Sequence, residues 1–185
     1  MTEQHKTHTS KLLSLVLRHS PQTIAITLDE NGWVAVSELL TALQQHNEAV
    51  TLTELEEIVA TNSKQRFAFS EDKLRIRANQ GHSVEVDMKF EAVQPPEQLY
   101  HGTVAATLQN IGHEGLRAMK RQHVHLSADM ATAEKVGARH GKPMILTINS
   151  GEMHRNGGTF YLSANGVWLT DNVPVLYINF PDHGE

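Results

Sequence analysis

The 185-residue sequence contains no cysteine and no long apolar run. Without cysteine, the chain cannot form disulfides, thiolate metal sites or a cysteine nucleophile. No apolar stretch approaches the roughly 20 residues that a membrane-spanning helix needs. The first residues, Met1-Thr2-Glu3-Gln4-His5-Lys6, are polar and lack the apolar core of a secretory signal. We therefore expect a cytoplasmic protein.

Basic residues are also outnumbered by acidic ones, 16 to 21, so the net charge is −5. A broad, nonspecific nucleic-acid surface is strongly basic, so the composition argues against one. Between Thr61 and His82, however, five basic residues accompany two acidic ones, a local net charge of +3. This excess can hold a few phosphates but is too small for a long nucleic-acid footprint. Hydrophobic and charged contents of 39% and 20% are ordinary for a globular protein of one or two domains.

The first half of the sequence begins with a predicted helix. Thr9-Ser10 can cap it, and Pro21 prevents its continuation. The segment Thr23 to Leu28 alternates in polarity and predicts a short extended piece before the Asn31-Gly32 turn. The apolar face of the helix would include Leu12, Leu13, Val16 and Leu17.

Two further helices and a hairpin complete this half. Ser37 can cap the second helix, and Thr51-Leu52-Thr53-Glu54 has the spacing of a capping box at the start of the third. Residues 66–69 and 74–78 are strand-like runs around a charged turn. Three helices followed by a hairpin is the order of a winged-helix domain, which by analogy alone suggests nucleic-acid binding.

Pro95-Pro96 is the best candidate for a linker, because successive prolines stop both helix and sheet pairing. We expect one lobe over residues 1–94 and a second over residues 95–185. The second lobe alternates strands and helices, which makes the expected fold class α+β. Its predicted strands are 99–101, 123–126, 144–148, 167–170 and 175–179, and its predicted helices are 105–112 and 130–140.

The segment Arg121 to Asp129 carries the first candidate site. Residues two apart in a strand point to one face, so His123 and His125 share a face opposite Val124 and Leu126. Two imidazoles beside a guanidinium suit a polar, phosphate-bearing ligand. A half-buried strand with a solvated histidine face explains the same pattern without a ligand.

A second group of the same chemistry, Arg18-His19, lies in the last turn of the first predicted helix. Cations there offset the helix dipole, which explains them without any function. The motifs that follow in the chain change this interpretation, because their order resembles one family, the NAD-dependent RNA 2′-phosphotransferases of the KptA type. The matching motifs are Leu17-Arg18-His19, Asp29-Glu30-Asn31-Gly32-Trp33, Lys64-Gln65-Arg66-Phe67, Gln80-Gly81-His82-Ser83, Leu99-Tyr100-His101-Gly102-Thr103, Arg121 to Ser127, and Asn165-Gly166-Val167-Trp168-Leu169-Thr170.

The resemblance covers about Ser10 to Tyr177 and implies a fold and a reaction. It implies a winged-helix-like RNA-binding lobe and an ADP-ribosyltransferase-like lobe that binds NAD between two small sheets. The implied substrate is RNA with an internal 2′-phosphate, as in tRNA processing, and NAD is consumed as co-substrate without a metal. An ADP-ribosylated RNA phosphate is the intermediate. The products are nicotinamide, ADP-ribose 1″,2″-cyclic phosphate and RNA with a free 2′-hydroxyl.

The resemblance also assigns the candidate catalytic residues. Arg18 and Arg66 would bind the 2′-phosphate, and Arg121 would bind the same phosphate or the NAD pyrophosphate. Arginine suits this role because its planar fork matches phosphate geometry. His19, whose ordinary pKa is near neutrality, would contact the transferring phosphate and move a proton in the second step. We expect a monomer.

The implied NAD-binding residues lie in the second lobe. His101 would bind the ribose on the adenosine side, Gly102 and Thr103 would lie near nicotinamide, and His125 and Ser127 would line the other wall. Val167 stands where many ADP-ribosyltransferases carry a catalytic glutamate, which an anionic phosphate acceptor does not need. Trp33 and Trp168 are expected in the core.

Three alternatives remain at this point. His123 and His125 are candidate metal ligands if His101 or His140 supplies a third, although this stretch lacks the carboxylates that many such sites use. The second alternative is a winged-helix regulator whose C-terminal lobe senses NAD or ADP-ribose without catalysis. The third alternative is a transferase that caps terminal RNA or DNA phosphates with ADP-ribose and stops after the first step.

Overall fold

The computed structural model describes residues 1–181 and divides into two compact units, Met1–Lys89 and Phe90–Glu185. We call these the N-terminal and C-terminal units, and each has its own hydrophobic core. The division falls shortly before Pro95-Pro96. The backbone N–H of Val93 donates to the Phe160 carbonyl at 2.8 Å, which joins this stretch to the C-terminal unit. The fold is mixed α+β with small antiparallel sheets, as the sequence predicts.

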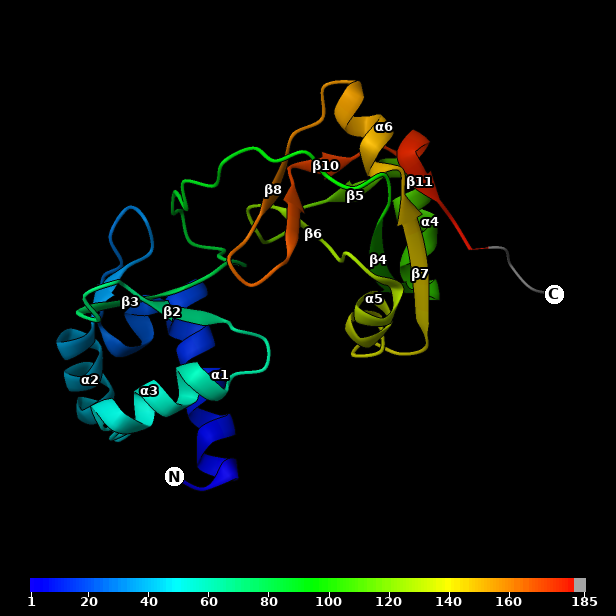
Figure 1. Ribbon diagram of the computed structural model, residues 1–185. Coiled ribbons are helices and arrows are strands. Elements are labelled where there is room, and N and C mark those ends of the chain that lie inside the picture. Colours follow the sequence, from blue (N-terminus) through cyan, green and yellow to red (C-terminus); the bar gives the residue numbers. More distant parts are fainter. Residues whose placement is uncertain (182–185) are drawn as a thin grey trace. The chain divides into compact units, whose positions relative to one another are not determined.

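The N-terminal unit contains three α-helices and one three-stranded antiparallel sheet of order β1-β3-β2 (Figure 1). The predicted order of three helices followed by a hairpin is confirmed. Its elements are α1 (Glu3–Arg18), the 3-10 helix η1 (Pro21–Ile24), β1 (Val34–Ala35), α2 (Val36–Gln45), α3 (Leu52–Thr61), β2 (Phe67–Phe69) and β3 (Arg75–Ala78).

The apolar faces of the three helices share one hydrophobic core with buried residues of the sheet. Full burial of a leucine or isoleucine stabilises a fold by roughly 1.5–3 kcal/mol, so this core is the main source of the unit's stability. The predicted capping box is confirmed, because the Thr51 hydroxyl accepts from the Glu54 N–H at 3.3 Å and Glu54 Oε2 accepts from the Thr51 N–H at 2.9 Å. Fully buried core side chains include Leu13, Leu17, Leu39, Leu43, Leu55 and Ile76.

Three local predictions in this unit are wrong. Helix α1 begins earlier than Thr9-Ser10, because the Thr2 hydroxyl caps it by accepting from the His5 N–H at 3.2 Å. Ser37 does not cap α2: the chain passes directly from β1 into the helix, and the Val36 N–H donates to the Leu74 carbonyl. The first part of the expected extended segment forms η1, which ends at Ala25 with a positive φ of 55°.

The C-terminal unit contains two three-stranded antiparallel sheets, β11-β7-β4 and β6-β9-β8. A two-stranded ribbon, β10-β5, is a third sheet in the part of the chain that the structure describes, where two were expected. The elements are β4 (Leu99–Val104), α4 (Ala105–Glu114), β5 (Leu116–Arg117), β6 (Val124–Leu126), α5 (Met130–Gly137), β7 (Pro143–Ile148), α6 (Ser150–Arg155), β8 (Phe160–Leu162), β9 (Trp168–Thr170), β10 (Asn172–Val173), η2 (Val175–Tyr177) and β11 (Ile178–Asn179).

Most of the predicted elements of this unit are confirmed, but four were missed: β5, α6, β8 and β10. The expected strand over residues 175–179 is only partly correct, because the first residues after Pro174 form the 3-10 turn η2. Trp168 is buried, as predicted. Trp33 is only half-buried, and the guanidinium carbons of Arg77 and Arg75 lie 4.4 and 5.4 Å from its ring centroid.

Helix α5 packs against β4 and β7 (Figure 1). Gly102 permits this contact, because a Cβ atom at this position would overlap the carbonyl oxygen of Ala133 in α5. The family resemblance implies that this glycine lies near nicotinamide, and the structure adds helix packing as a second reason for a glycine at this position. Within residues 1–181, no helix is both long and apolar enough to cross a membrane.

Candidate active site

Arg18 and His19 lie at the C-terminal end of α1. Arg18 occupies the last turn and is half-buried, while His19 is the exposed C-cap residue whose N–H donates to the Leu15 carbonyl at 2.9 Å. The free carbonyls of a helix end favour a cation. Leu17 and Val16 anchor this turn in the core, so the positions of the two polar side chains are set by the helix.

The loop containing Ser83 docks onto this helix end. Its N–H donates to the Arg18 carbonyl at 2.9 Å, and its hydroxyl lies 2.9 Å from His19 Nδ1. A hydroxyl can donate to or accept from an imidazole nitrogen, so this contact is available in either protonation state of His19. Ser83 therefore fixes the orientation of the His19 ring.

His82 lies behind the same helix end and is almost fully buried. Burial, together with the positive charges of Arg18, His19 and Arg77, lowers the pKa of His82 to about 4. The imidazole is therefore neutral at physiological pH and adds no positive charge beside Arg18 and Arg77.

Arg66 is placed by the turn between α3 and β2. Asn62 Oδ1 accepts from the N–H groups of Lys64 and Arg66, at 3.1 and 3.4 Å, and Gln65 adopts a positive φ of 42°. The Asn79 side chain donates to the Gln65 carbonyl at 2.5 Å and stabilises this unusual backbone. Arg18 Nη2 lies 3.5 Å from the Arg66 carbonyl oxygen, so the two arginines are neighbours.

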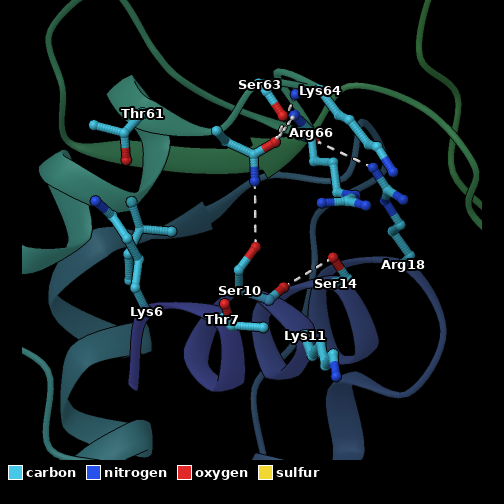
Figure 2. Close-up of a pocket in the computed structure, with 12 residues that line it drawn as sticks. Lys6, Thr7, Ser10, Lys11, Ser14, Arg18, Thr61, Ser63, Lys64 and Arg66 are labelled. Carbon is cyan, nitrogen blue, oxygen red and sulfur yellow. Dashed lines mark hydrogen bonds between the residues drawn. The ribbon is translucent and has the colours of Figure 1, made fainter. Parts of the chain in front are cut away.

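Arg18 and Arg66 line one groove of about 560 Å³ between α1 and the segment that joins α3 to β2 (Figure 2). Lys64 lies beside them in the lining, so three cations face the same space. A single anionic group such as a phosphate suits this end of the groove, because arginine binds phosphate oxygens through paired N–H donors.

In the C-terminal unit, the ends of two sheets meet where Tyr100 and Ser127 exchange backbone hydrogen bonds of 2.9 and 2.8 Å. His101 follows Tyr100, and its Nδ1 lies 3.0 Å from the His125 carbonyl oxygen. A carbonyl can only accept, so Nδ1 of His101 carries the proton. Burial lowers the pKa of His101, and the nearby charge of Arg121 lowers it further, although the hydrogen bond to His125 opposes this shift. The neutral ring therefore presents Nε2 as an acceptor.

Arg121 contacts His125 across the start of β6. Its Nη1 lies 3.1 Å from His125 Nδ1. Guanidinium only donates, so Nδ1 of His125 is the acceptor and, in the neutral ring, its Nε2 carries a proton. Desolvation by surrounding protein atoms, with the charge of Arg139, lowers the pKa of Arg121. The result is a donor-rich pair beside the acceptor nitrogen of His101.

The remaining predicted NAD-binding residues lie around these strands. Thr103 is buried on β4 and its hydroxyl lies 2.5 Å from that of Thr107, which itself donates to the Val104 carbonyl. The Thr103 proton is thereby directed to Thr107, and only its lone pairs are available to a ligand. Val167 is half-buried in the β8–β9 turn, where its N–H donates to the Ser163 hydroxyl at 3.0 Å.

The metal-site alternative finds no support in the described residues. Within residues 1–181, no three histidine, aspartate or glutamate side chains are grouped so that they could hold a metal ion. His123 instead packs edge-on against the rings of Phe90 and Tyr161, and its Nε2 lies 4.0 Å from Asp171 Oδ1. The predicted strand faces are confirmed, since Val124 and Leu126 are buried while both histidines are partly exposed.

The predicted catalytic set is distributed over both units: Arg18, His19 and Arg66 gather in the N-terminal unit, and Arg121 lies in the C-terminal unit with His101 and His125. Sequence reasoning assigned no role to Ser83 or to Lys11, which also lines the groove. The signal for Ser83 was its place in the Gln80-Gly81-His82-Ser83 motif, and the signal for Lys11 was helical spacing from Arg18.

Comparison with known proteins places the chain in a family. Residues 4–172 match the RNA 2′-phosphotransferase, Tpt1 / KptA family, and the chain belongs to this family. It is 52% identical over 180 residues to a probable RNA 2′-phosphotransferase of Flavobacterium johnsoniae, covering 97% of this chain and 99% of the relative. Proteins of the same name from Streptomyces griseus and Rhodopirellula baltica are 51% and 53% identical, over 96% and 94% of this chain and 98% and 95% of the relatives.

Proposed function

We propose that the protein removes an internal 2′-phosphate from RNA and transfers it to NAD. A phosphate oxygen forms a bond to the ribose carbon that bears nicotinamide, and nicotinamide leaves. The neighbouring ribose hydroxyl then attacks phosphorus, the bond between phosphorus and the RNA 2′-oxygen breaks, and that oxygen takes up a proton. The products are RNA with a 2′-hydroxyl, ADP-ribose 1″,2″-cyclic phosphate and nicotinamide.

The observation that carries this proposal is the pairing of Arg18 and Arg66 in one groove beside an oriented imidazole. Phosphoryl transfer requires little covalent chemistry from the protein and depends on positioning and charge stabilisation. Two guanidinium groups meet this requirement at the non-bridging oxygens. The name of the family and of its relatives supports the same substrate.

His19 is the proton-transfer group of the proposal. Its Nδ1 contacts the Ser83 hydroxyl at 2.9 Å, and we assign the proton transfer to the other ring nitrogen, Nε2. An imidazole is suited to both halves of the second step, because it can accept the proton of the attacking hydroxyl or donate one to the departing RNA oxygen near neutral pH. Holding the ring in one orientation makes this transfer efficient.

The C-terminal unit would bind NAD. The acceptor nitrogen of His101 is suited to a ribose hydroxyl, which must donate, and Arg121 is suited to the pyrophosphate or to the transferring phosphate. His125 holds the Arg121 guanidinium in place through its Nδ1. Val167 provides no general base, which is consistent with an acceptor that is already an anion.

The test is incubation of the protein with NAD and a short 2′-phosphorylated oligonucleotide, followed by identification of the products. We expect the cyclic ADP-ribose phosphate from the wild type. Arg18→Ala, His19→Ala and Arg121→Ala should abolish phosphate release without loss of fold. The matched control Arg117→Ala, which removes an exposed arginine that pairs with the exposed Glu114, should react normally. Near-normal turnover in the first three variants would refute the assignment.

Two other outcomes would replace the proposal. A stable ADP-ribosylated oligonucleotide would show a transferase that stops after the first step and would favour the capping of terminal phosphates. Sequence-specific duplex binding without release of nicotinamide would show a regulator that binds NAD without catalysis.

A further inference from the structure

The groove that contains Arg18 and Arg66 extends well beyond these two residues. Twelve residues line it, and none of these described lining residues is acidic. In Figure 2, Arg18, Lys64 and Arg66 lie toward one end and Lys6 toward the other, with Lys11 on the α1 side between them. A groove this basic is unexpected in a chain of net charge −5 and indicates a local anionic ligand.

The face of α1 that borders the groove is polar throughout. Thr7, Ser10, Ser14 and Arg18 recur at helical spacing on one side, while Leu13, Val16 and Leu17 on the other side enter the core. Ser10 accepts from the Asn62 side chain at 3.2 Å, which holds the two walls of the groove together. Hydroxyls between cations are typical partners of sugar and phosphate oxygens.

The cations differ in how far their charge is already compensated. Lys6 lies 2.8 Å from Glu57 Oε1 and 3.8 Å from Glu3 Oε1, and the Glu57 contact raises the Lys6 pKa. Lys11 is exposed and makes no ion pair within residues 1–181. The basic path therefore runs from Arg18 to Lys11 and is closed by the carboxylates around Lys6.

From this arrangement we infer that the groove binds the backbone of the RNA strand that carries the 2′-phosphate, and that Lys11 contacts a flanking phosphate. The inference rests on the proposed function, in that Arg18 and Arg66 bind the 2′-phosphate itself. A strand attached to that phosphate must leave the site in some direction, and the groove is continuous with both arginines.

The dimensions fit a short stretch of single strand. Seven residues separate Lys11 from Arg18, about 10 Å along the helix axis at 1.5 Å per residue. At a rise of about 3.4 Å per nucleotide, this distance corresponds to roughly three nucleotides. The groove therefore provides contacts for nearby phosphates only, which agrees with the low overall positive charge.

The test measures binding without turnover. Two RNAs with the same central 2′-phosphate, one limited to its immediate neighbours and one extended on both sides, are titrated by fluorescence anisotropy in the absence of NAD. Lys11→Ala is compared with Lys89→Ala, which removes the same charge from an exposed residue that does not line the groove. Circular dichroism verifies that both variants are folded.

We expect Lys11→Ala to weaken binding of the extended RNA without changing the affinity for the short RNA. Lys89→Ala should bind both RNAs with the affinity of the wild type. For single strands, each lost phosphate contact lowers the slope of log K against log salt by about 0.7. The affinity ratio of wild type to Lys11→Ala should therefore shrink about threefold between 50 and 200 mM salt.

Equal effects of Lys11→Ala on both RNAs, or an unchanged salt slope, would overturn the inference even if the wild type consumes NAD and releases phosphate. If the wild type shows no turnover but the length-dependent loss in Lys11→Ala persists, the groove still binds RNA and only the proposed reaction fails. Binding of both RNAs that is insensitive to Arg18→Ala would refute the assignment of the 2′-phosphate as well.

Discussion

Acidification from pH 7 to pH 5 should destabilise the N-terminal unit through one buried side chain, His82. The ordinary pKa of histidine is 6.5, whereas the His82 pKa is about 4 in the folded protein. Between these values the unfolded chain binds a proton that the folded chain does not bind. Stability is therefore complete above about pH 6.5 and is lost as the pH falls toward 4.

The magnitude follows from the size of the shift. One pKa unit corresponds to about 1.4 kcal/mol, so a shift from 6.5 to about 4 costs about 3 kcal/mol at the acidic limit. At pH 5 the linkage relation gives a loss of about 2 kcal/mol relative to pH 7. This loss is a large fraction of the stability of a small unit. His82 is almost fully buried, so solvent screening does not reduce the figure much.

Fluorescence can report this unit alone. The chain has two tryptophans, so the Trp168→Phe background leaves Trp33 as the only one, in the N-terminal unit. Urea unfolding at pH 7 and pH 5 then gives the free energy of unfolding at each pH. In His82→Gln, which cannot protonate, the pH dependence over this interval should largely disappear, whatever its stability at pH 7.

The matched control is His46→Gln, which removes an exposed imidazole at the end of α2. Between pH 7 and pH 5, the free energy of unfolding of this variant should fall by about 2 kcal/mol, as in the wild type, because the buried imidazole of His82 is still present. If His82→Gln is as sensitive to acid as the wild type, the burial of His82 does not control the acid stability of this unit.

Glycine, cap and positioning variants test other contacts. Gly102→Ala should lower the free energy of unfolding by about 3 kcal/mol, the upper range for overpacking, because the new Cβ meets the Ala133 carbonyl. Gly112→Ala has open space within α4 and should raise the free energy of unfolding by about 0.5–1 kcal/mol. Thermal unfolding that ranks the two variants otherwise would contradict the packing argument. Thr51→Ala should cost about 1 kcal/mol in urea unfolding through loss of the cap. If His19 acts as proposed, Ser83→Ala should lower turnover about tenfold, which corresponds to about the free energy of one hydrogen bond. The Tm should not change, whereas the pH–rate profile should. An unchanged pH–rate profile would show that Ser83 does not orient the His19 ring.

Local chemistry in the sequence was enough to predict much of the fold. Helical periodicity located α1, α2 and α3, and the Thr51 capping box set the start of α3 correctly. Alternation placed β6 and the faces of its side chains. The errors at the starts of α1 and α2 share one cause: several residues near each start can cap a helix, and packing and strand pairing select among them.

The motifs likewise identified the family and most of the candidate site residues, because the identity and order of residues are properties of the sequence alone. Contacts between residues far apart in the chain required the tertiary structure. Ser83 reaches His19 across 64 positions, and Arg18 reaches Arg66 across 48, so no local pattern predicts either contact.

The burial and the charge of individual side chains likewise depended on the tertiary structure. Composition showed twelve histidines, but only the folded chain shows that His82 is enclosed beside cations while others are solvated. The sequence also contained the polar face of α1 without revealing what faces it. The groove exists because the turn after α3 folds back over that face, and the pKa of a group depends on the neighbours that such folding brings to it.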